Sequence, residues 1–159
     1  MLSSYFQNHR VMCCPSTKCL TLTLSLAGLL LSLYALHVET QASKDPEYVA
    51  LCDISSLSLS CSKVLASRYG KGFGVVGPLL GEDHELNQPN SVYGIIFYSI
   101  MLLLAFLTGK FMSRLQFFLS VSSVLASVYL AYILYFILEE LCPLCVSTYV
   151  VNFLLFITR

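Results

Sequence analysis

The sequence has no tryptophan and very little charge. Only 11% of its 159 residues are Asp, Glu, Lys or Arg, and their formal charges cancel, whereas soluble domains carry about 25%. A net charge of zero, without runs of like charge, gives no indication of nucleic-acid binding. The three histidines, His9, His37 and His84, are scattered along the chain, so we expect no metal site built on them.

Hydrophobic sequence takes the place of charge. Of all residues 57% are hydrophobic, and the mean hydropathy is +0.75. Four apolar stretches are long enough to cross a bilayer: residues 20–38, 91–108, 113 or 115 to 138, and 142–158. We therefore expect an all-α membrane protein, a single domain over residues 1–159 that folds as a four-transmembrane-helix bundle. A cleaved signal peptide is the alternative for the first stretch, but its apolar run is longer than a typical signal core.

Four spans place both termini on one side of the membrane. Residues 39–90 then form a large loop and cap segment on the other side, together with the turn at 139–141. Every acidic residue falls on the loop side, and the terminal side carries five basic residues: Arg10, Lys18, Lys110, Arg114 and Arg159. The positive-inside rule makes the termini cytosolic and the loop lumenal. Four basic residues in the loop weaken this bias without reversing it: Lys44, Lys63, Arg68 and Lys71.

The seven cysteines divide according to this topology. The cytosolic side holds Cys13, Cys14 and Cys19, which we interpret as spare thiols in preference to palmitoylation sites. The other side holds two pairs, in a compartment where disulfides persist. These pairs are Cys52 with Cys61 in the loop and Cys142 with Cys145 at the fourth span. Two such pairs can pass electrons by thiol–disulfide exchange.

Cys142 and Cys145 form a Cys-x-x-Cys motif where an apolar helix is expected to begin. Residues three apart lie on one helix face, and Tyr149 continues that face. The first cysteine lies near the positive end of the helix dipole, which favours a thiolate, and Pro143 suits the first turn. We interpret the motif as a redox pair that acts on a lipid-soluble substrate. Half of a zinc site is a less favoured alternative, because no second Cys-x-x-Cys exists, and so is a pair of inert buried thiols.

The loop contains a glycine-rich stretch at residues 70–77. No Gly-Lys-Ser/Thr follows it, so a phosphate-binding loop is not supported. We expect a flexible, partly apolar flap on the bilayer surface, to which Leu79 and Leu80 add contact. We also expect Asn90 or Ser91 to cap the helix of the second span.

Several motifs, spread over most of the chain, carry a family resemblance. They are Ala50-Leu51-Cys52-Asp53, Cys61-Ser62, Gly72-Phe73-Gly74, Leu86-Asn87-Gln88-Pro89-Asn90-Ser91 with Gly94 and Phe97-Tyr98, Ser127-Val128-Tyr129-Leu130-Ala131-Tyr132-Ile133-Leu134, and Cys142-x-x-Cys145-x-x-x-Tyr149. From about residue 20 to the end, the chain resembles the vitamin K epoxide reductase family. The resemblance implies a multi-pass protein of the endoplasmic reticulum membrane. It would reduce vitamin K 2,3-epoxide to the quinone and the quinone to the hydroquinone, without a separate cofactor.

The resemblance also implies roles for the cysteines. Cys142 and Cys145 would be the active-site pair, with Cys145 attacking the substrate and Cys142 exchanging with the loop pair. Cys52 and Cys61 would relay electrons from a thioredoxin-like protein in the lumen. The loop pair here encloses eight residues, one more than we expect of the family, and a proline inside the Cys-x-x-Cys is also unusual.

The same resemblance implies a substrate pocket. Asn90 and Tyr149 would donate hydrogen bonds to the two substrate oxygens, and Phe97, Tyr93 and Leu65 would complete the pocket. Leu65 and Tyr93 stand where phenylalanine is expected. The 4-hydroxycoumarin anticoagulants that inhibit the family would occupy the same pocket.

Two other functions remain as alternatives. A quinone-linked disulfide-forming oxidase would use the same four cysteines. A non-enzymatic, four-span junctional protein of the claudin type also carries a disulfide in its first large loop. That class has a tryptophan motif in the loop, which this chain does not contain.

Overall fold

The computed structural model describes residues 16–45, 47–53, 59–107 and 109–158. Four helices dominate: α1 (Ser16–Lys44), α4 (Asn90–Phe106), α5 (Lys110–Phe136) and α6 (Pro143–Ile157). Short elements lie between α1 and α4: α2 (Cys61–Ala66), the 3₁₀ turns η3 (Arg68–Gly70) and η4 (Gly72–Gly74), and α3 (Val76–Leu80). Over these described ranges the structure contains no strand, only two isolated bridges, so the prediction of an all-α protein is confirmed.

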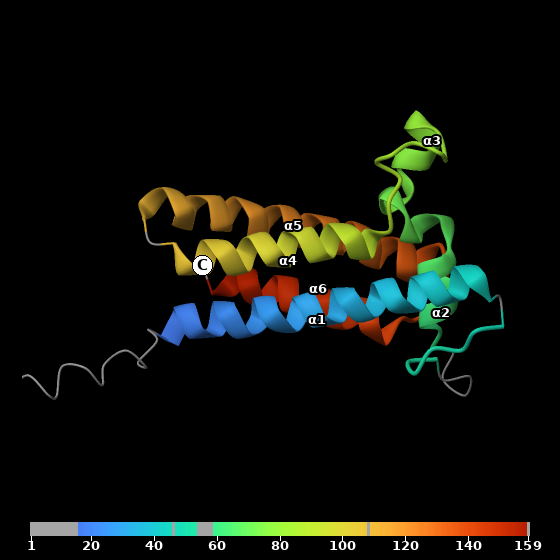
Figure 1. Ribbon diagram of the computed structural model, residues 1–159, viewed down its shortest axis with the longest axis horizontal. Coiled ribbons are helices and arrows are strands. Elements are labelled where there is room, and N and C mark those ends of the chain that lie inside the picture. The colour runs from blue at the N-terminus through green and yellow to red at the C-terminus, as the bar shows by residue number, and fades with distance from the viewer. Residues whose placement is uncertain (1–15, 46, 54–58, 108, 159) are drawn as a thin grey trace, which may run out of the picture.

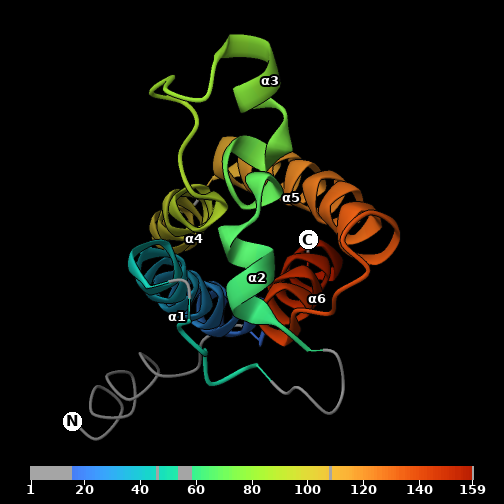
Figure 2. The ribbon, with the colours of Figure 1, turned by 90° about the vertical axis from the view of Figure 1, so that its right-hand side faces the viewer.

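The four long helices are arranged in a ring, and the segment between α1 and α4 covers one end of this bundle. Helix α1 packs against α4 and α6, and α5 packs against the same two helices (Figure 1). Helix α2 contacts both α1 and α6 and lies across the end of the ring (Figure 2). Helix α3 stands away from the bundle at that same end. The segment between α1 and α4 therefore forms a cap over one end of the bundle.

Two helices, α1 with 29 residues and α5 with 27, are long and apolar enough to cross a membrane. Helices α4 and α6 are apolar but shorter, with 17 and 15 residues. At 1.5 Å per residue they measure about 26 and about 23 Å, against about 30 Å for a bilayer core. Among the described helices, α1 and α5 are thus candidates for membrane spans.

Helix bounds agree with the predicted spans to within a few residues at most ends. The exception is the end of α1, which continues through residues 39–44, a stretch that the sequence analysis assigned to the loop. This stretch contains neither glycine nor proline, and Lys44 lies in the last turn, where the helix dipole favours a positive charge. A hydropathy pattern marks the apolar part of a helix and not its end.

Glycines allow α1 and α4 to approach closely. A Cβ atom on Gly28 would lie 2.2 Å from the ring of Tyr98, and one on Gly94 would lie 2.6 Å from Ser32 Oγ. Small residues at such interfaces let helix backbones meet in membranes. As a result the Tyr98 side chain is almost completely buried.

The glycine-rich stretch is held by hydrogen bonds to residues outside it. Gly72 N–H donates to the Gln88 carbonyl oxygen over 2.8 Å. Phe73 N–H donates to Asn90 Oδ1 over 2.8 Å, and Asn90 Nδ2 donates to the Tyr69 carbonyl oxygen over 2.7 Å. These contacts are long-range, so the glycine pattern alone did not indicate them. Farther along, Leu79 and Leu80 on α3 are exposed, at 74% and 55%.

The predicted cap of the second span is also wrong. Pro89 precedes α4, no side chain caps this helix, and Asn90 is its first residue. Asn90 bonds to the loop instead, and Ser91 donates a hydrogen bond to Glu39 on α1. Both side chains thus make hydrogen bonds to distant residues instead of capping the helix as the local capping rule had predicted.

Candidate active site

Helix α6 begins with the Cys-x-x-Cys motif. Cys142 is the N-cap residue, its sulfur accepts a hydrogen bond from Cys145 N–H over 3.2 Å, and Pro143 occupies the first turn. The Cys145 thiol and the N–H groups of Cys145 and Leu144 donate to this sulfur. Although burial opposes them, these donors hold the pKa of Cys142 below its usual value. The local geometry therefore favours a thiolate at Cys142, as the helix-end argument predicted.

A cavity of about 410 Å³ opens beside this motif, between the helices and under the cap. Cys145 contributes to its wall, while Cys142 is fully buried. The wall also contains all five residues predicted to bind substrate: Leu65, Asn90, Tyr93, Phe97 and Tyr149. The fold thus brings these side chains, from α2, α4 and α6, around one largely apolar space beside a thiol.

The polar groups among these residues are not equally free. Tyr93 donates its hydroxyl to the Leu86 carbonyl oxygen, and its ring lies 5.2 Å from that of Phe73. The Asn90 amide is bonded at both ends to the cap, which leaves one Nδ2 hydrogen. Within the described ranges the Tyr149 hydroxyl makes no hydrogen bond, so it can donate into the cavity.

The loop cysteines form a disulfide, Cys52–Cys61, which packs at the end of the bundle. Cys61 is fully buried and belongs to the same buried cluster as Cys142, while Cys52 packs against that cluster from its edge. Exposed residues lie just before Cys52, with Leu51 at 90% and Val49 at 71%. One end of the disulfide therefore lies near the surface and the other near the Cys-x-x-Cys motif.

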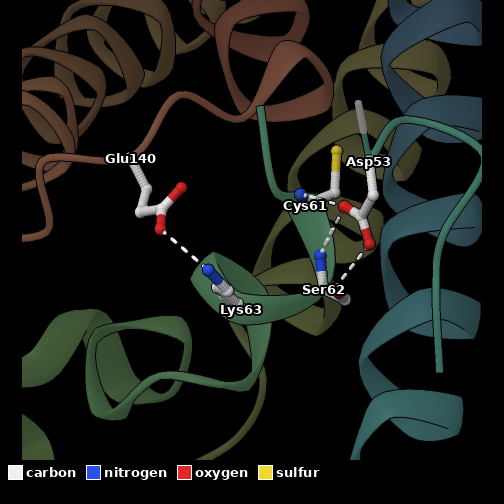
Figure 3. A network of polar contacts seen from close by, with 5 residues as sticks. All are labelled: Asp53, Cys61, Ser62, Lys63 and Glu140. Atoms are coloured by element: carbon white, nitrogen blue, oxygen red, sulfur yellow. Dashed lines mark hydrogen bonds and ion pairs between the residues drawn. The ribbon is translucent and has the colours of Figure 1, made fainter. Parts of the chain in front are cut away.

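Asp53 holds this loop to α2, a role that the sequence analysis missed. Its carboxylate accepts hydrogen bonds from the N–H groups of Cys61 and Ser62 and from the Ser62 hydroxyl (Figure 3). It also accepts a hydrogen bond from Ala50 N–H. Partial burial raises the pKa of Asp53, but these four donors outweigh it and bring the pKa below its usual value. The loop sulfurs and a carboxylate oxygen lie within 4.8 Å of one another, yet the disulfide and these hydrogen bonds already engage them. The Asp53 carboxylate thus accepts hydrogen bonds from the first N–H groups of α2, although it lies eight residues earlier in the sequence.

The cap is also joined to the turn before Cys142. Ser60 N–H donates to the Leu141 carbonyl oxygen over 2.9 Å. Lys63 and Glu140 form an ion pair of 3.1 Å, which Figure 3 shows beside the Asp53 network. These contacts fix the loop disulfide next to the start of α6.

A polar chain crosses the bundle below the cavity. The Tyr98 hydroxyl donates to Asn152 Oδ1 over 2.8 Å, and Asn152 Nδ2 donates to Ser127 Oγ over 2.9 Å. The three residues come from α4, α6 and α5 and all line the cavity. Sequence reasoning gave them no role, because nothing local connects residues that lie so far apart in the chain.

Comparison with known proteins agrees with this arrangement. The model of the vitamin K epoxide reductase family matches residues 19–159. The vitamin K epoxide reductase complex subunit 1 of Mus musculus is 50% identical over 131 residues, which are 82% of this chain and 81% of that protein. Its counterpart in Rattus norvegicus is 50% identical over 133 residues, 84% of this chain and 82% of that protein. These matches set aside the claudin-type alternative, and the chain belongs to the vitamin K epoxide reductase family.

Proposed function

We propose that the chain reduces vitamin K 2,3-epoxide to the quinone, and the quinone to the hydroquinone, within the endoplasmic reticulum membrane. Family membership and the names of the two relatives support this activity. The observation that carries the proposal is the position of Cys145. Its thiol lines an apolar cavity and is paired with a cysteine whose surroundings favour a thiolate.

In this proposal the substrate ring lies in the cavity next to Cys145. The Cys142 thiolate accepts the proton of the Cys145 thiol, and the Cys145 sulfur attacks the ring. The Cys142 sulfur then attacks Cys145, and the two electrons and this proton pass to the substrate as the disulfide forms. The Tyr149 hydroxyl and the remaining Asn90 Nδ2 hydrogen donate to the substrate oxygens. In a cavity that excludes water, such donors stabilise negative charge that develops on those oxygens. Phe97, Tyr93 and Leu65 contact the ring, and 4-hydroxycoumarin inhibitors would bind in the same place.

The electron supply is part of the same proposal. A thioredoxin-like protein in the lumen reduces the Cys52–Cys61 disulfide, and the loop dithiol reduces Cys142–Cys145 by exchange. Support comes from the buried cluster that Cys61 and Cys142 share and from the exposed residues just before Cys52. Four membrane crossings, with both termini cytosolic and the cap lumenal, would place all four cysteines in one oxidising compartment. The short helices α4 and α6 would then span the membrane beside α1 and α5.

Turnover of cysteine variants tests this function. The purified full chain is supplied with vitamin K epoxide and a small, membrane-permeable dithiol. Cys145→Ala and Cys142→Ala should abolish turnover, whereas Cys52→Ala and Cys61→Ala should keep it, because the small dithiol bypasses the loop. Full activity of Cys145→Ala would refute the proposal. Oxidation of a reduced partner protein, without consumption of the epoxide, would favour the oxidase alternative.

A further inference from the structure

Glu39, a buried acidic residue of α1, has no part in the function proposed above. Its side chain is 4% exposed. Oε2 accepts a hydrogen bond from Ser91 Oγ over 2.8 Å, and Oε1 has no hydrogen-bond partner among the described residues. Burial favours the neutral, protonated form of such a group unless several donors hold its charge. Asp53 has four donors and Glu39 has one.

Glu39 is connected to the cavity through Ser91. Ser91 lies on α4 and lines the cavity. Its hydroxyl, which is hydrogen-bonded to Glu39, can accept a proton from Glu39 while it donates its own proton to a molecule in the cavity. Glu39 on α1 and Cys145 on α6 belong to helices that pack against each other. From the cap, the positive charge of Lys71 acts on the carboxyl group, while Lys63 of α2 is paired with Glu140.

The chemistry needs a proton from a group of this kind. Reduction of the quinone to the hydroquinone takes up two electrons and two protons, and reduction of the epoxide to quinone and water takes up the same number. If Cys142 is a thiolate, the cysteine pair supplies both electrons but only the one proton of Cys145. The second proton must come from another group at the cavity or from solution.

We propose that Glu39 carries this second proton and delivers it to the substrate through the Ser91 hydroxyl. The inference rests on the proposed function and adds a proton source to it. The Cys142 thiolate, the Cys145 thiol and protonated Glu39 react with the quinone to give the disulfide, the hydroquinone and the Glu39 carboxylate. With the epoxide the products are the disulfide, the quinone, water and the carboxylate. When the loop dithiol reduces Cys142–Cys145 again, two protons are available, one for Cys145 and one for Glu39.

Steady-state kinetics of the full chain, driven by a membrane-permeable dithiol, provide the first test. Wild-type kcat for vitamin K epoxide should fall as the pH rises, because Glu39 loses its proton. Glu39→Gln keeps an oxygen for Ser91 but has no acidic proton, so kcat should drop about 100-fold and lose that pH dependence. KM should stay within about twofold, since Glu39 does not line the cavity. Glu39→Asp should restore the pH dependence, and the exposed acid Glu47 provides the control, Glu47→Gln, with wild-type kinetics.

A single turnover provides the second test. Reduced enzyme in weak buffer with a pH indicator is mixed with vitamin K quinone. In wild type the disulfide should form first and uptake of about one proton should follow it, as solution reprotonates the Glu39 carboxylate. In Glu39→Gln the uptake of about one proton should keep pace with disulfide formation, because solution is then the direct proton source. Ser91→Ala keeps the carboxyl group and should slow kcat as Glu39→Gln does.

Wild-type kcat and an unchanged pH profile in Glu39→Gln would overturn the inference, and so would proton uptake by the wild-type enzyme that keeps pace with disulfide formation. If Glu39→Gln does not fold, the proton uptake of wild type and the kcat of Ser91→Ala decide the question. Cys145→Ala separates the two levels of the argument. If Cys145→Ala is inactive while Glu39→Gln is normal, the proton source is wrong and the thiol mechanism stands.

Discussion

Replacement of Asp53 by asparagine should loosen the cap, with an effect that can be calculated from its contacts. Asparagine keeps one carbonyl oxygen, which can still accept from the N–H groups of Cys61 and Ser62. It cannot accept from Ala50 N–H and the Ser62 hydroxyl, which both bond to Oδ2 in the wild type. Two lost hydrogen bonds cost about 2 kcal/mol in total. For a chain of this size, that lowers the melting temperature by about 4–8 °C.

The assay is thermal unfolding of the purified protein, with the Cys52–Cys61 disulfide intact and after its reduction. The decrease should be larger in the reduced protein, because the disulfide no longer joins the loop to α2. The exposed acid Asp83 gives the matched control, Asp83→Asn, which should have the melting temperature of the wild type. Because the folded-state pKa of Asp53 is lowered, its stabilisation is present above the pKa of unfolded aspartate, about 4, and is lost as the pH falls through the lower folded value. An unchanged melting temperature in both redox states would refute the idea that Asp53 holds the cap.

Three further predictions concern the bundle and the cavity. Gly28→Ala should destabilise the protein by about 1–3 kcal/mol, measured by thermal unfolding, because the new methyl group meets the buried Tyr98 ring; a wild-type melting temperature would contradict the close approach of α1 and α4. Tyr149→Phe should lower kcat/KM for vitamin K epoxide about tenfold through the loss of one hydrogen-bond donor, and unaltered kinetics would exclude a contact with substrate. Titration of thiolate absorbance in the reduced protein, with Cys142→Ala as the reference, should show Cys142 ionising at a lower pH than a model thiol; ionisation at or above the pH of the model thiol would remove the basis for a resting thiolate.

Much of the fold followed from hydropathy and spacing. Apolar runs separated by short polar turns indicated the helices that became α4, α5 and α6, because each run is bounded by charged or helix-breaking residues. The Cys-x-x-Cys at the start of α6 was likewise visible, since a proline and a helix start are local features. The positions of the residues around the cavity came from the family resemblance and not from periodicity.

What sequence reasoning missed depends on contacts between distant segments. Asp53 caps a helix that begins eight residues later, and Asn90 bonds to a loop about twenty residues before it. Glu39 looked like the first polar residue after a span, yet it is buried between helices. No local sequence pattern distinguishes an exposed acidic residue at the end of a membrane span from one that α4 buries. The burial of such a residue is therefore visible only in the three-dimensional structure.

Asn90 joins the wall of the cavity to its cover, and this has a consequence for ligands. The side chain bonds to the cap segment through its oxygen and through one amide hydrogen. The nitrogen that would donate to a quinone oxygen is therefore the same one that bonds to Tyr69. A flat ring that fits under the cap segment would stabilise this arrangement by accepting a hydrogen bond from the second amide hydrogen. A thicker molecule would break the bond between the amide and Tyr69 and would displace the cap segment as it entered. Compounds of different thickness should therefore leave α2 and the 3₁₀ turns with different protection against hydrogen exchange.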